Sequence, residues 1–543
     1  MKAYRLLVTL LALALLLSVG ALASGEPSGG LSGGPSGEVD SAYIAVVDGA
    51  VAADKLIDPA LVGRFDESGA EALILAPNDF TGTLLYVSGE DSVFTLKDCY
   101  LRKGVDAASA GETPANGVVV TDGTLYVDNS IIEVAGAGTD SDYGIAAYGD
   151  ATVIFRDSVL FQSGKAGADG LCDAVEKRGG YFAGTARGTF LAGRSNSYFY
   201  NSKEIAEGWA AISTDSAQDL NVICYNNVAT ALNGGYAIYA DTSCRDWLYG
   251  SELRSAEYGA VLTNNGELHL YPGSAATEEF ALKYFPEDGE RTDKGSVITA
   301  GRNCIWVHCP DMSGGGTDQF ITPITAEDSR LVTDEAWDAR QTLLDYAGTY
   351  GQGVADYVNF QKGAIFCLYS AAADIDLVRC ELESYSGTIL MTTVNNDPMC
   401  PRFIKTGGTA YTTNLRMTEM DVTGDVKNYD YQRPVAVTLS GTKWSGAAET
   451  WTAEDWDGYW AYAKDFENVN WVGLGPEYDK TTRGTSVTLE EGSVWTVTGN
   501  SHLENFVIGA DCAVVYGTAT VNGQPAELLP GQTYTGEIII TAA

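Results

Sequence analysis

Basic residues are scarce in this chain of 543 residues. Lys and Arg together number 33 against 72 Asp and Glu, which gives a formal net charge of -39 at pH 7. Because phosphate backbones are held by clustered Lys and Arg, this balance excludes a nucleic-acid partner. It also disfavours an electrostatic hold on anionic membranes or polyuronate chains unless metal ions intervene. The charge instead predicts a self-repelling surface in contact with solvent.

Metal-binding spacings of histidine and cysteine are absent. The chain has three histidines in unrelated contexts and no CxxC or HxxxH spacing, which argues against a zinc site. The ten cysteines do not suggest a disulfide framework either, because Cys224, Cys304 and Cys367 fall inside apolar runs. We expect mostly reduced, buried thiols, with Cys304 and Cys309 as the best candidate pair for a local bridge.

Long apolar runs are limited to the N-terminus. Met1–Ala23 has two basic residues, an apolar centre and a small-residue end, Ala21-Leu22-Ala23, which together predict a cleaved secretory signal peptide. Residues 24–40 form a Gly/Ser/Pro-rich linker. Since no second run of this length follows, we expect no transmembrane segment after cleavage. The pattern predicts a protein that is secreted or held at the cell surface.

A degenerate phrase returns along most of the remaining chain. It consists of a short apolar run, a turn with Asp, Gly or Asn, a second alternating run, and a Ser, Asn or Cys just after it. GVVVTDGTLYVDNSII (117–132) is the clearest copy, and Cys99 and Cys380 occupy the final slot elsewhere. Neighbouring copies start 27, 26 and 23 residues apart in places. A period of this length is typical of a stacked array.

The phrase has the alternation of β-strands. In TLYVDNSII, Leu125, Val127 and Ile131 are expected to point inward, and Tyr126 and Asp128 outward. A coil of 23 to 28 residues holds about three such strands, and stacked coils pair in parallel at about 4.8 Å. The predicted fold is all-β, a parallel β-helix solenoid whose interior is a dry column of aliphatic, small and cysteine side chains.

The repeat grammar resembles that of the right-handed parallel β-helix group, the pectin-lyase-like fold. The resemblance covers most of Gly117–Leu382 and returns at Thr485–Gly523. It implies the fold and a likeness to secreted bacterial β-helix proteins, many of them adhesin-like or uncharacterised. The polygalacturonase-like motifs GHG and RIK and the pectate-lyase-like motifs WIDH and RxPxxR are missing. The resemblance therefore implies no activity.

Breaks in the grammar predict the domain organisation. We expect a β-helix domain over 41–440, with a loop at Gly164–Gly193 and a helical insertion at 325–351. An aromatic and acidic insertion is expected over 441–484. Residues 485–543 are expected to form the last coils and a cap, because an open solenoid end exposes strand edges.

Alignment of the copies puts four Asp and one Asn in the same turn slot, namely Asp122, Asp150, Asp215, Asp241 and Asn264. Asp215 and Asp241 belong to consecutive copies and could lie one strand spacing apart. Two carboxylates this close favour a cation, and Ca²⁺ is the natural candidate. The alternative is that both are solvated turn residues that point away from each other.

Two further groups are candidates for chemistry or binding. Asp215, Asp219, Asp241, Arg245 and Asp246 offer the carboxylates of a polysaccharide hydrolase, or the base and cation site of a uronate lyase.

The densest aromatic patch contains Trp456, Tyr459 and Trp460, which are candidates for stacking on sugar rings. These residues could equally pin the insertion onto the column.

Two functions are compatible with this sequence. The first is a secreted or cell-surface scaffold, adhesin-like, that binds glycans or proteins without catalysis. The alternative is a polysaccharide-degrading enzyme, a pectate-lyase-like lyase or a glycoside hydrolase, which uses acidic residues on adjacent coils.

Overall fold

The computed structural model describes most of the chain after its first 40 residues. It describes residues 39, 41–57, 65–70, 73–75, 83–103, 116–135, 143–163, 187–206, 210–232, 235–263, 265–308, 321–337, 362–394, 404, 406–463 and 478–543. The predicted signal peptide Met1–Ala23 lies outside these residues, as does the linker 24–40 apart from Val39.

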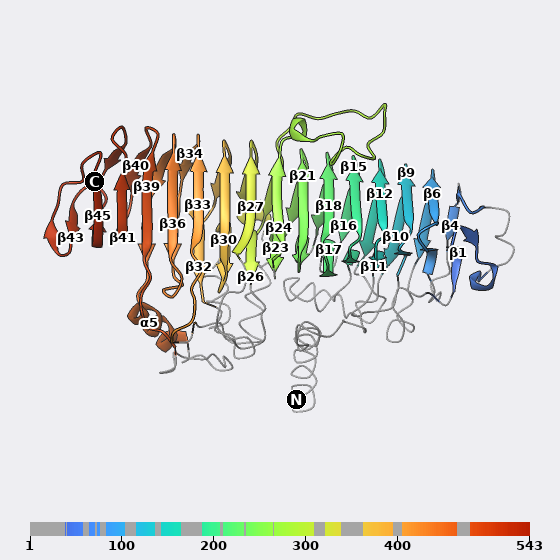
Figure 1. Ribbon diagram of the computed structural model, residues 1–543, viewed down its shortest axis with the longest axis horizontal. Coiled ribbons are helices and arrows are strands. Elements are labelled where there is room, and N and C mark those ends of the chain that lie inside the picture. The colour runs from blue at the N-terminus through green and yellow to red at the C-terminus, as the bar shows by residue number, and fades with distance from the viewer. Residues whose placement is uncertain are drawn as a thin grey trace.

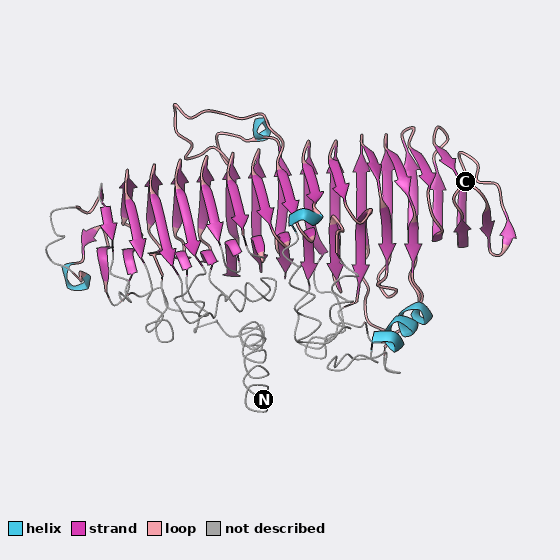
Figure 2. Cartoon of the chain, turned by 180° about the vertical axis from the view of Figure 1, so that it is seen from behind, coloured by secondary structure: helices cyan, strands magenta, loops and turns pink. Residues whose placement is uncertain are grey.

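The chain winds into a long column of stacked parallel strands (Figures 1 and 2). From β3 to β32, each coil contributes one strand to sheet B, one to sheet C and one to sheet A, in that order along the chain. Neighbouring coils pair in parallel along the column, as between β9, β12 and β15. The predicted all-β, parallel β-helix fold is confirmed.

Sheet A consists of β1 (Ala42–Val47), β2 (Ala50–Val51), β5 (Thr83–Ser88), β8 (Val118–Thr121), β11 (Tyr143–Tyr148), β14 (Arg187–Gly193), β17 (Ala210–Ala217), β20 (Tyr236–Asp241), β23 (Tyr258–Thr263), β26 (Asn303–His308), β29 (Phe366–Tyr369), β32 (Thr388–Thr393), β35 (Asp425–Asn428) and β38 (Ala448–Thr450).

Sheet B consists of β3 (Gly69–Ala70), β6 (Val93–Lys97), β9 (Thr124–Asp128), β12 (Thr152–Arg156), β15 (Asn196–Tyr200), β18 (Leu220–Tyr225), β21 (Cys244–Tyr249), β24 (Glu267–Tyr271), β27 (Ile321–Glu327), β30 (Ala372–Val378), β33 (Thr413–Thr418), β36 (Val435–Ser440), β39 (Thr485–Glu490), β41 (Ser501–Ile508), β43 (Ala519–Val521), β44 (Gln524–Pro525) and β45 (Thr533–Ile540).

Sheet C consists of β4 (Leu73–Leu75), β7 (Tyr100–Lys103), β10 (Ile131–Ala135), β13 (Val159–Ser163), β16 (Lys203–Ala206), β19 (Val228–Ala231), β22 (Glu252–Ser255), β25 (Val297–Ala300), β28 (Arg330–Thr333) and β31 (Glu381–Ser384), and it is followed along the column by sheet D, with β34 (Asp421–Thr423), β37 (Lys443–Gly446), β40 (Val494–Val497) and β42 (Ala513–Val515). The described helical segments are the short turns η1 (Ala53–Lys55), η3 (Gly273–Ala275) and η4 (Glu335–Trp337) and the helix α5 (Ala453–Ala463).

A single left-handed residue turns the chain from sheet B to sheet C. Asn129 has φ 43° between β9 and β10, a conformation that Asn and Asp tolerate better than most residues. Leu125 and Val127 are fully buried before it, as predicted. Ile131 was predicted to point inward, but it is 43% exposed and Ile132 is buried instead. The prediction was wrong because the turn resets the alternation.

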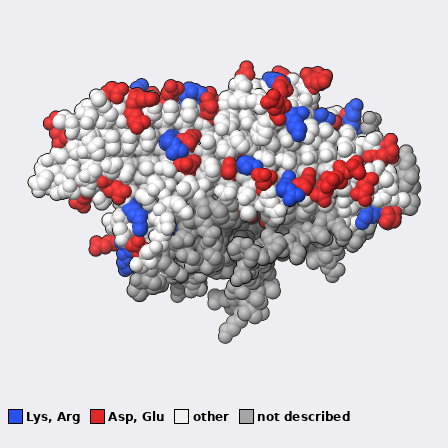
Figure 3. Space-filling model, in the orientation of Figure 1, with Lys and Arg blue, Asp and Glu red and all other residues white. Residues whose placement is uncertain are grey.

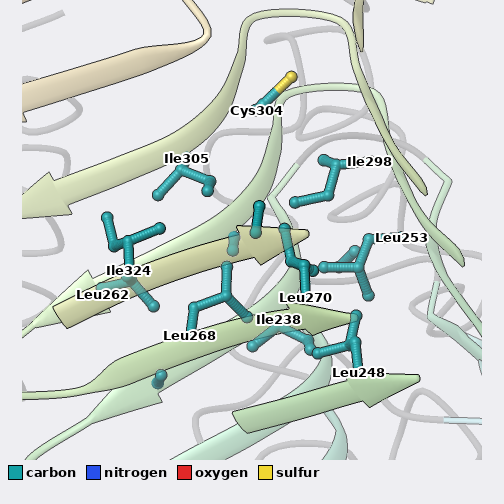
Figure 4. Packing of buried hydrophobic residues seen from close by; sticks show 14 of the residues in the cluster. Ile238, Leu248, Leu253, Leu262, Leu268, Leu270, Ile298, Cys304, Ile305 and Ile324 are labelled. Atoms are coloured by element: carbon teal, nitrogen blue, oxygen red, sulfur yellow. The ribbon is translucent and has the colours of Figure 1, made fainter. Parts of the chain in front are cut away.

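The interior is a continuous apolar column to which all three sheets contribute. Figure 4 shows Leu268 and Leu270 of β24 among Leu262 of β23, Ile298 of β25 and Ile305 of β26. All five side chains are fully buried. Burying apolar area of this kind is the main force that stabilises the coils.

A chain of side-chain hydrogen bonds runs along the column just after the sheet B turn, and we call it the serine ladder. The backbone N–H of Ser130 donates to Ser158 Oγ at 3.0 Å, and that of Ser158 to Ser202 Oγ at 3.1 Å. The ladder continues through Ser202 N–H to Asn227 Oδ1 and Asn227 N–H to Ser251 Oγ, both at 3.1 Å. These bonds satisfy buried donors at the turn, where the sheets do not pair.

Cysteine occupies the same slot in two coils. Cys99 Sγ lies 3.0 Å from the carbonyl oxygen of Ala70, and Cys380 Sγ lies 3.2 Å from that of Ala326. Both are free and buried, as are the other described cysteines, Cys224, Cys244, Cys304, Cys367 and Cys512. The expectation of reduced, buried thiols is therefore confirmed for these residues. Cys304 makes no bridge, and Cys309 lies outside the described residues.

Antiparallel strands close both ends of the column. At the N-terminal end β2 folds back on β1, and at the C-terminal end β45 pairs antiparallel with β41 and β43. The strand edges that a parallel stack would expose are therefore partly covered. The structure has the cap that the sequence predicted.

The prediction of a helical insertion at 325–351 is wrong for its first residues. Its first residues complete β27 and form β28, and Leu331 is fully buried in the column. Of the remainder, Glu335–Trp337 is a short turn and 338–351 lies outside the described residues. Leu331 fits a helical spacing and a strand spacing equally well, which is why the prediction was wrong here.

The start predicted for the insertion at 441–484 is also wrong, because its first residues belong to the column. Residues Lys443–Gly446 and Ala448–Thr450 are strands β37 and β38, and Trp444 is buried against Trp495 with ring centroids 4.8 Å apart. The chain leaves the column only after Thr450, where α5 follows. The aromatic content of this segment reflects core packing in one part and an excursion in the other.

One excursion was not predicted, and we call residues 272–296 the strap. It leaves the column after β24 and returns at β25 (Figure 1, green loop). Ala281 and Leu282 are buried against outward tyrosines of sheet B, including Tyr200 and Tyr225. The strap therefore covers part of the outer face of sheet B.

We predict that Ser158→Ala destabilises the protein by about 1–3 kcal/mol, because the Ser130 N–H loses its acceptor in a buried site. Chemical denaturation followed by tryptophan fluorescence measures the change. Ser486→Ala, in a half-buried outward position of β39, is the matched control and should have a smaller effect. Equal effects of the two substitutions would contradict the importance of the ladder.

Candidate functional site

The outer face of sheet A brings two of the predicted acidic residues onto neighbouring strands. Asp215 lies on β17 and Asp241 at the end of β20, and these strands pair in parallel. Arg187 Nη1 donates to Asp215 Oδ2 at 3.3 Å, and Thr263 Oγ1 donates to Asp241 Oδ1 at 2.5 Å. The prediction that adjacent coils place these carboxylates in one slot fits this arrangement.

Asp219 and Arg245 lie elsewhere, on the sheet B side of the turn. The Arg245 guanidinium pairs with the Asp219 carboxylate, and its Nε donates to Asn221 Oδ1 at 3.1 Å. The Asp219 side chain is 70% exposed. An exposed pair of this kind contributes little to stability.

Asp246 is inside the column. Its register neighbours are Val222 and Leu268, and its side chain is fully buried. Cys244 Sγ donates to its Oδ1 at 3.1 Å. Burial raises the pKa of Asp246 to about 7. Because it is sealed among core residues, Asp246 cannot contact a polysaccharide.

The five residues considered for catalysis therefore occupy three separate places. Asp215 and Asp241 lie on the outer face of sheet A, Asp219 and Arg245 at an exposed turn, and Asp246 in the core. The sequence placed them on the same two coils but could not tell which face each strand presents. As a group they do not form an active site.

The described residues also do not gather three His, Cys, Asp or Glu side chains around a point that could hold a metal ion. In the turn slot, Asp122 Oδ1 accepts the backbone N–H of Asp150 at 2.9 Å, and the Asp150 carboxylate pairs with Arg194 at 2.5 Å. Asn264 lies outside the described residues. The turn acids that the structure places are engaged with the chain itself, so the Ca²⁺ hypothesis for Asp215 and Asp241 gains no support.

The predicted aromatic patch proves to be mainly a packing site. Trp456 is fully buried on α5 and clusters with Val394 and Tyr431. The Trp456 and Tyr459 ring centroids are 5.9 Å apart, and Tyr459 is half-buried. The Trp460 side chain lies outside the described residues. Because its ring has no exposed face, Trp456 pins α5 to the column rather than stacking on a sugar.

A different set of rings lies on the outer face of sheet A, and we call Tyr236, Tyr258, Trp306, His308 and Tyr369 the aromatic row. Successive ring centroids are separated by 5.7, 4.9, 5.1 and 5.5 Å. Three of these contacts are stacked, and the rings extend from β20 to β29, with Trp306 and His308 on the same strand, β26.

Exposure along the aromatic row increases toward the C-terminal side. Tyr258 is 2% exposed and lies under Arg302, whose guanidinium carbon is 4.9 Å from the ring centroid. Trp306, His308 and Tyr369 are half-buried. Sequence reasoning missed the row, although the recurrence of Tyr as the first residue of β20 and β23, at Tyr236 and Tyr258, carried a signal.

Carboxylates and phenols share this face. Burial, together with the charges of Asp241 and Asp215, raises the pKa of Tyr239 well above its ordinary value. Burial, Tyr143 and Asp215 likewise raise the pKa of Tyr148. Both hydroxyls therefore stay protonated near neutral pH and remain hydrogen-bond donors.

Basic side chains elsewhere are used in ion pairs between coils. Arg156 pairs with Asp128 at 2.5 Å and Arg379 with Asp328 at 2.8 Å, in each case across neighbouring coils. Figure 3 shows Lys and Arg interspersed among more numerous acidic side chains on the face it presents. The described part of that face has no large basic patch.

A pocket of about 410 Å³ lies between the turns after sheet B and the strap. It is lined by oxygen-bearing side chains, Asp157, Asn201 and Asn226 from the turns and Asp288 and Glu290 from the strap. The Asn226 amide donates to Asn201 Oδ1 at 2.8 Å, so part of the lining is already paired. The pocket is polar and has none of the convergent apolar walls of a small-molecule site.

Neither a protein-family model nor a curated protein matches this chain. Among the described residues, no helix is long and apolar enough to span a membrane. The fold is a parallel β-helix on the evidence of its strand pairing alone.

We predict that Trp456→Ala releases α5 from the column without unfolding the coils. The loss of a buried indole costs about 3–5 kcal/mol locally. Hydrogen exchange should show lost protection over Ala453–Ala463 while β36 and β39 keep theirs. Trp337→Ala, at a 37% exposed ring, is the control and should leave both regions unchanged. Unchanged protection of α5 in the Trp456 variant would contradict its anchoring role.

Proposed function

We propose that the protein is a secreted or cell-surface β-helix scaffold, adhesin-like, whose sheet A outer face binds glycans without catalysis. The observation that carries the proposal is the C-terminal part of the aromatic row, where the half-buried rings of Trp306, His308 and Tyr369 stack across the neighbouring strands β26 and β29. Sugar rings stack on aromatic faces through their apolar side. A row along the axis suits an extended chain rather than a single small ligand.

Polar groups next to the aromatic row support the same proposal. Trp306 and His308 lie on β26, and Thr263, which donates to Asp241, pairs in register with His308. The carboxylates of Asp241 and Asp215 could accept hydrogen bonds from sugar hydroxyls beside the stacked rings. Their negative charge favours neutral glycans over polyuronates.

The likeness to secreted pectin-lyase-like proteins is compatible with this proposal, and it extends to the fold and export rather than to the chemistry. The enzymatic alternative, a polysaccharide lyase or glycoside hydrolase, required Asp215, Asp241 and Arg245 to converge. Arg245, on β21, pairs instead with Asp219, whose side chain is 70% exposed. The scaffold hypothesis therefore has the stronger support.

A glycan array followed by titration calorimetry tests the proposal. We expect binding to neutral polysaccharides, and a loss of about three- to tenfold in affinity for each of Trp306→Ala and Tyr369→Ala, since an aromatic contact contributes about 0.5–1.5 kcal/mol. Trp337→Ala removes an exposed ring outside sheet A and should leave affinity unchanged. Absence of glycan binding, or binding that neither Trp306→Ala nor Tyr369→Ala weakens, would contradict the proposal.

Reducing-end and unsaturated-uronate assays, with and without Ca²⁺, complete the test. Binding without product supports a scaffold. Turnover that Asp241→Asn abolishes would instead establish the enzyme.

A further inference from the structure

Glu204 and Asp246 place carboxyl groups inside the apolar column, and neither has an ion-pair partner among the described residues. The first is Glu204 of β16, whose register neighbours in sheet C are Leu160 and Ala229. Its side chain is fully buried. Asn227 Nδ2 donates to Oε2, and Oε1 has no hydrogen-bond partner among the described residues.

The second carboxyl group is that of Asp246 on β21, which enters the column from sheet B. Its Oδ1 accepts the thiol of Cys244, and its Oδ2 has no hydrogen-bond partner within the described part of the chain. A buried carboxylate without a cation is costly, whereas the neutral acid is tolerated. Both sites therefore favour the protonated form.

The two groups share their surroundings. Cys224 of β18 lies between the coils that carry them, and both Glu204 and Asp246 raise the pKa of its thiol, after burial. Asp246, and more weakly Asp241 of sheet A, act on Cys244 in the same direction. The titratable groups that face this cluster from the packed strands are thus acids and thiols, and no described Lys, Arg or His compensates them.

The pH dependence follows from the direction of these shifts. Burial raises the pKa of Glu204 from 4.5 to about 8 and that of Asp246 from 3.8 to about 7. The native state therefore holds these protons more tightly than the unfolded chain does. The stability is fully present below the unfolded values and is lost as pH rises through the native ones.

We propose that Glu204 and Asp246 are kept as neutral acids inside the column and make the coils from β15 to β23 the segment that loosens first as pH rises. These are the coils that carry Asp215, Asp241 and the start of the aromatic row. A rise in extracellular pH would then weaken the column beneath the outer face of sheet A, whereas acidic conditions would keep these coils packed.

Equilibrium denaturation between pH 5 and pH 9 tests this pH dependence of stability. For the native protein, we expect the folding equilibrium constant to fall by about tenfold per pH unit for each acid in its titration window. The Glu204→Gln, Asp246→Asn double variant should lose most of this dependence. Glu381→Gln, at a 75% exposed side chain of β31, is the matched control and should keep the native dependence.

Two further measurements locate the effect and do not depend on how stable the variants are. Hydrogen exchange of the native protein, corrected for intrinsic rates, should show protection falling at least tenfold more in β15–β23 than in β33–β41 between pH 6 and pH 9. Unfolding at pH 6 should release about two more protons from the native protein than from the double variant. Uniform loss of protection, or equal proton release, would overturn the proposal.

Discussion

Every coil of this protein depends on the coil next to it, because the backbone donors of one coil find their acceptors in its neighbour. The parallel strands of sheets A, B and C do this directly, and the serine ladder does it at the turn between sheets B and C, where no strand pairing is possible. Since the ladder requires a short polar or thiol side chain at one position in each coil, it explains why Ser, Asn or Cys recurs there. The same requirement fixes the axial register, so that each inward residue stacks on an inward residue.

The repeat could be predicted from the sequence because this requirement leaves a period in the chain. Strand alternation, the turn residues and the ladder position could all be recognised in the sequence, and they correctly predicted an all-β parallel β-helix. The positions at which the chain leaves the column could not be recognised in the sequence in the same way. Apolar residues such as Leu331 fit both a helical and a strand spacing. Tertiary packing, and not local sequence, decides where the chain leaves the column.

The candidate site was less predictable, because function depends on which face a residue occupies. Asp215 and Asp241 were correctly expected on adjacent coils, but Asp246, five residues from Asp241, lies in the core because the chain has turned into sheet B. Trp456 carried an aromatic signal that reflects packing, whereas the aromatic row is dispersed over strands far apart in the chain. A solenoid gathers such residues only through its register. The outer face of sheet A and the acids in the core are therefore two consequences of one geometry.

The axial register of the coils is tested most directly by the spacing of outward residues along one row of sheet B. Strand pairing carries the row from Lys97 through Asp128, Arg156 and Tyr200 toward Glu327. Spin labels on Lys97→Cys and Glu327→Cys should lie about seven strand spacings apart, or ~34 Å at the usual inter-strand distance, with a narrow distribution. Pulsed electron resonance measures this distance. A broad distribution, or a mean well outside the range that label flexibility allows, would contradict the stacked register on which the account rests.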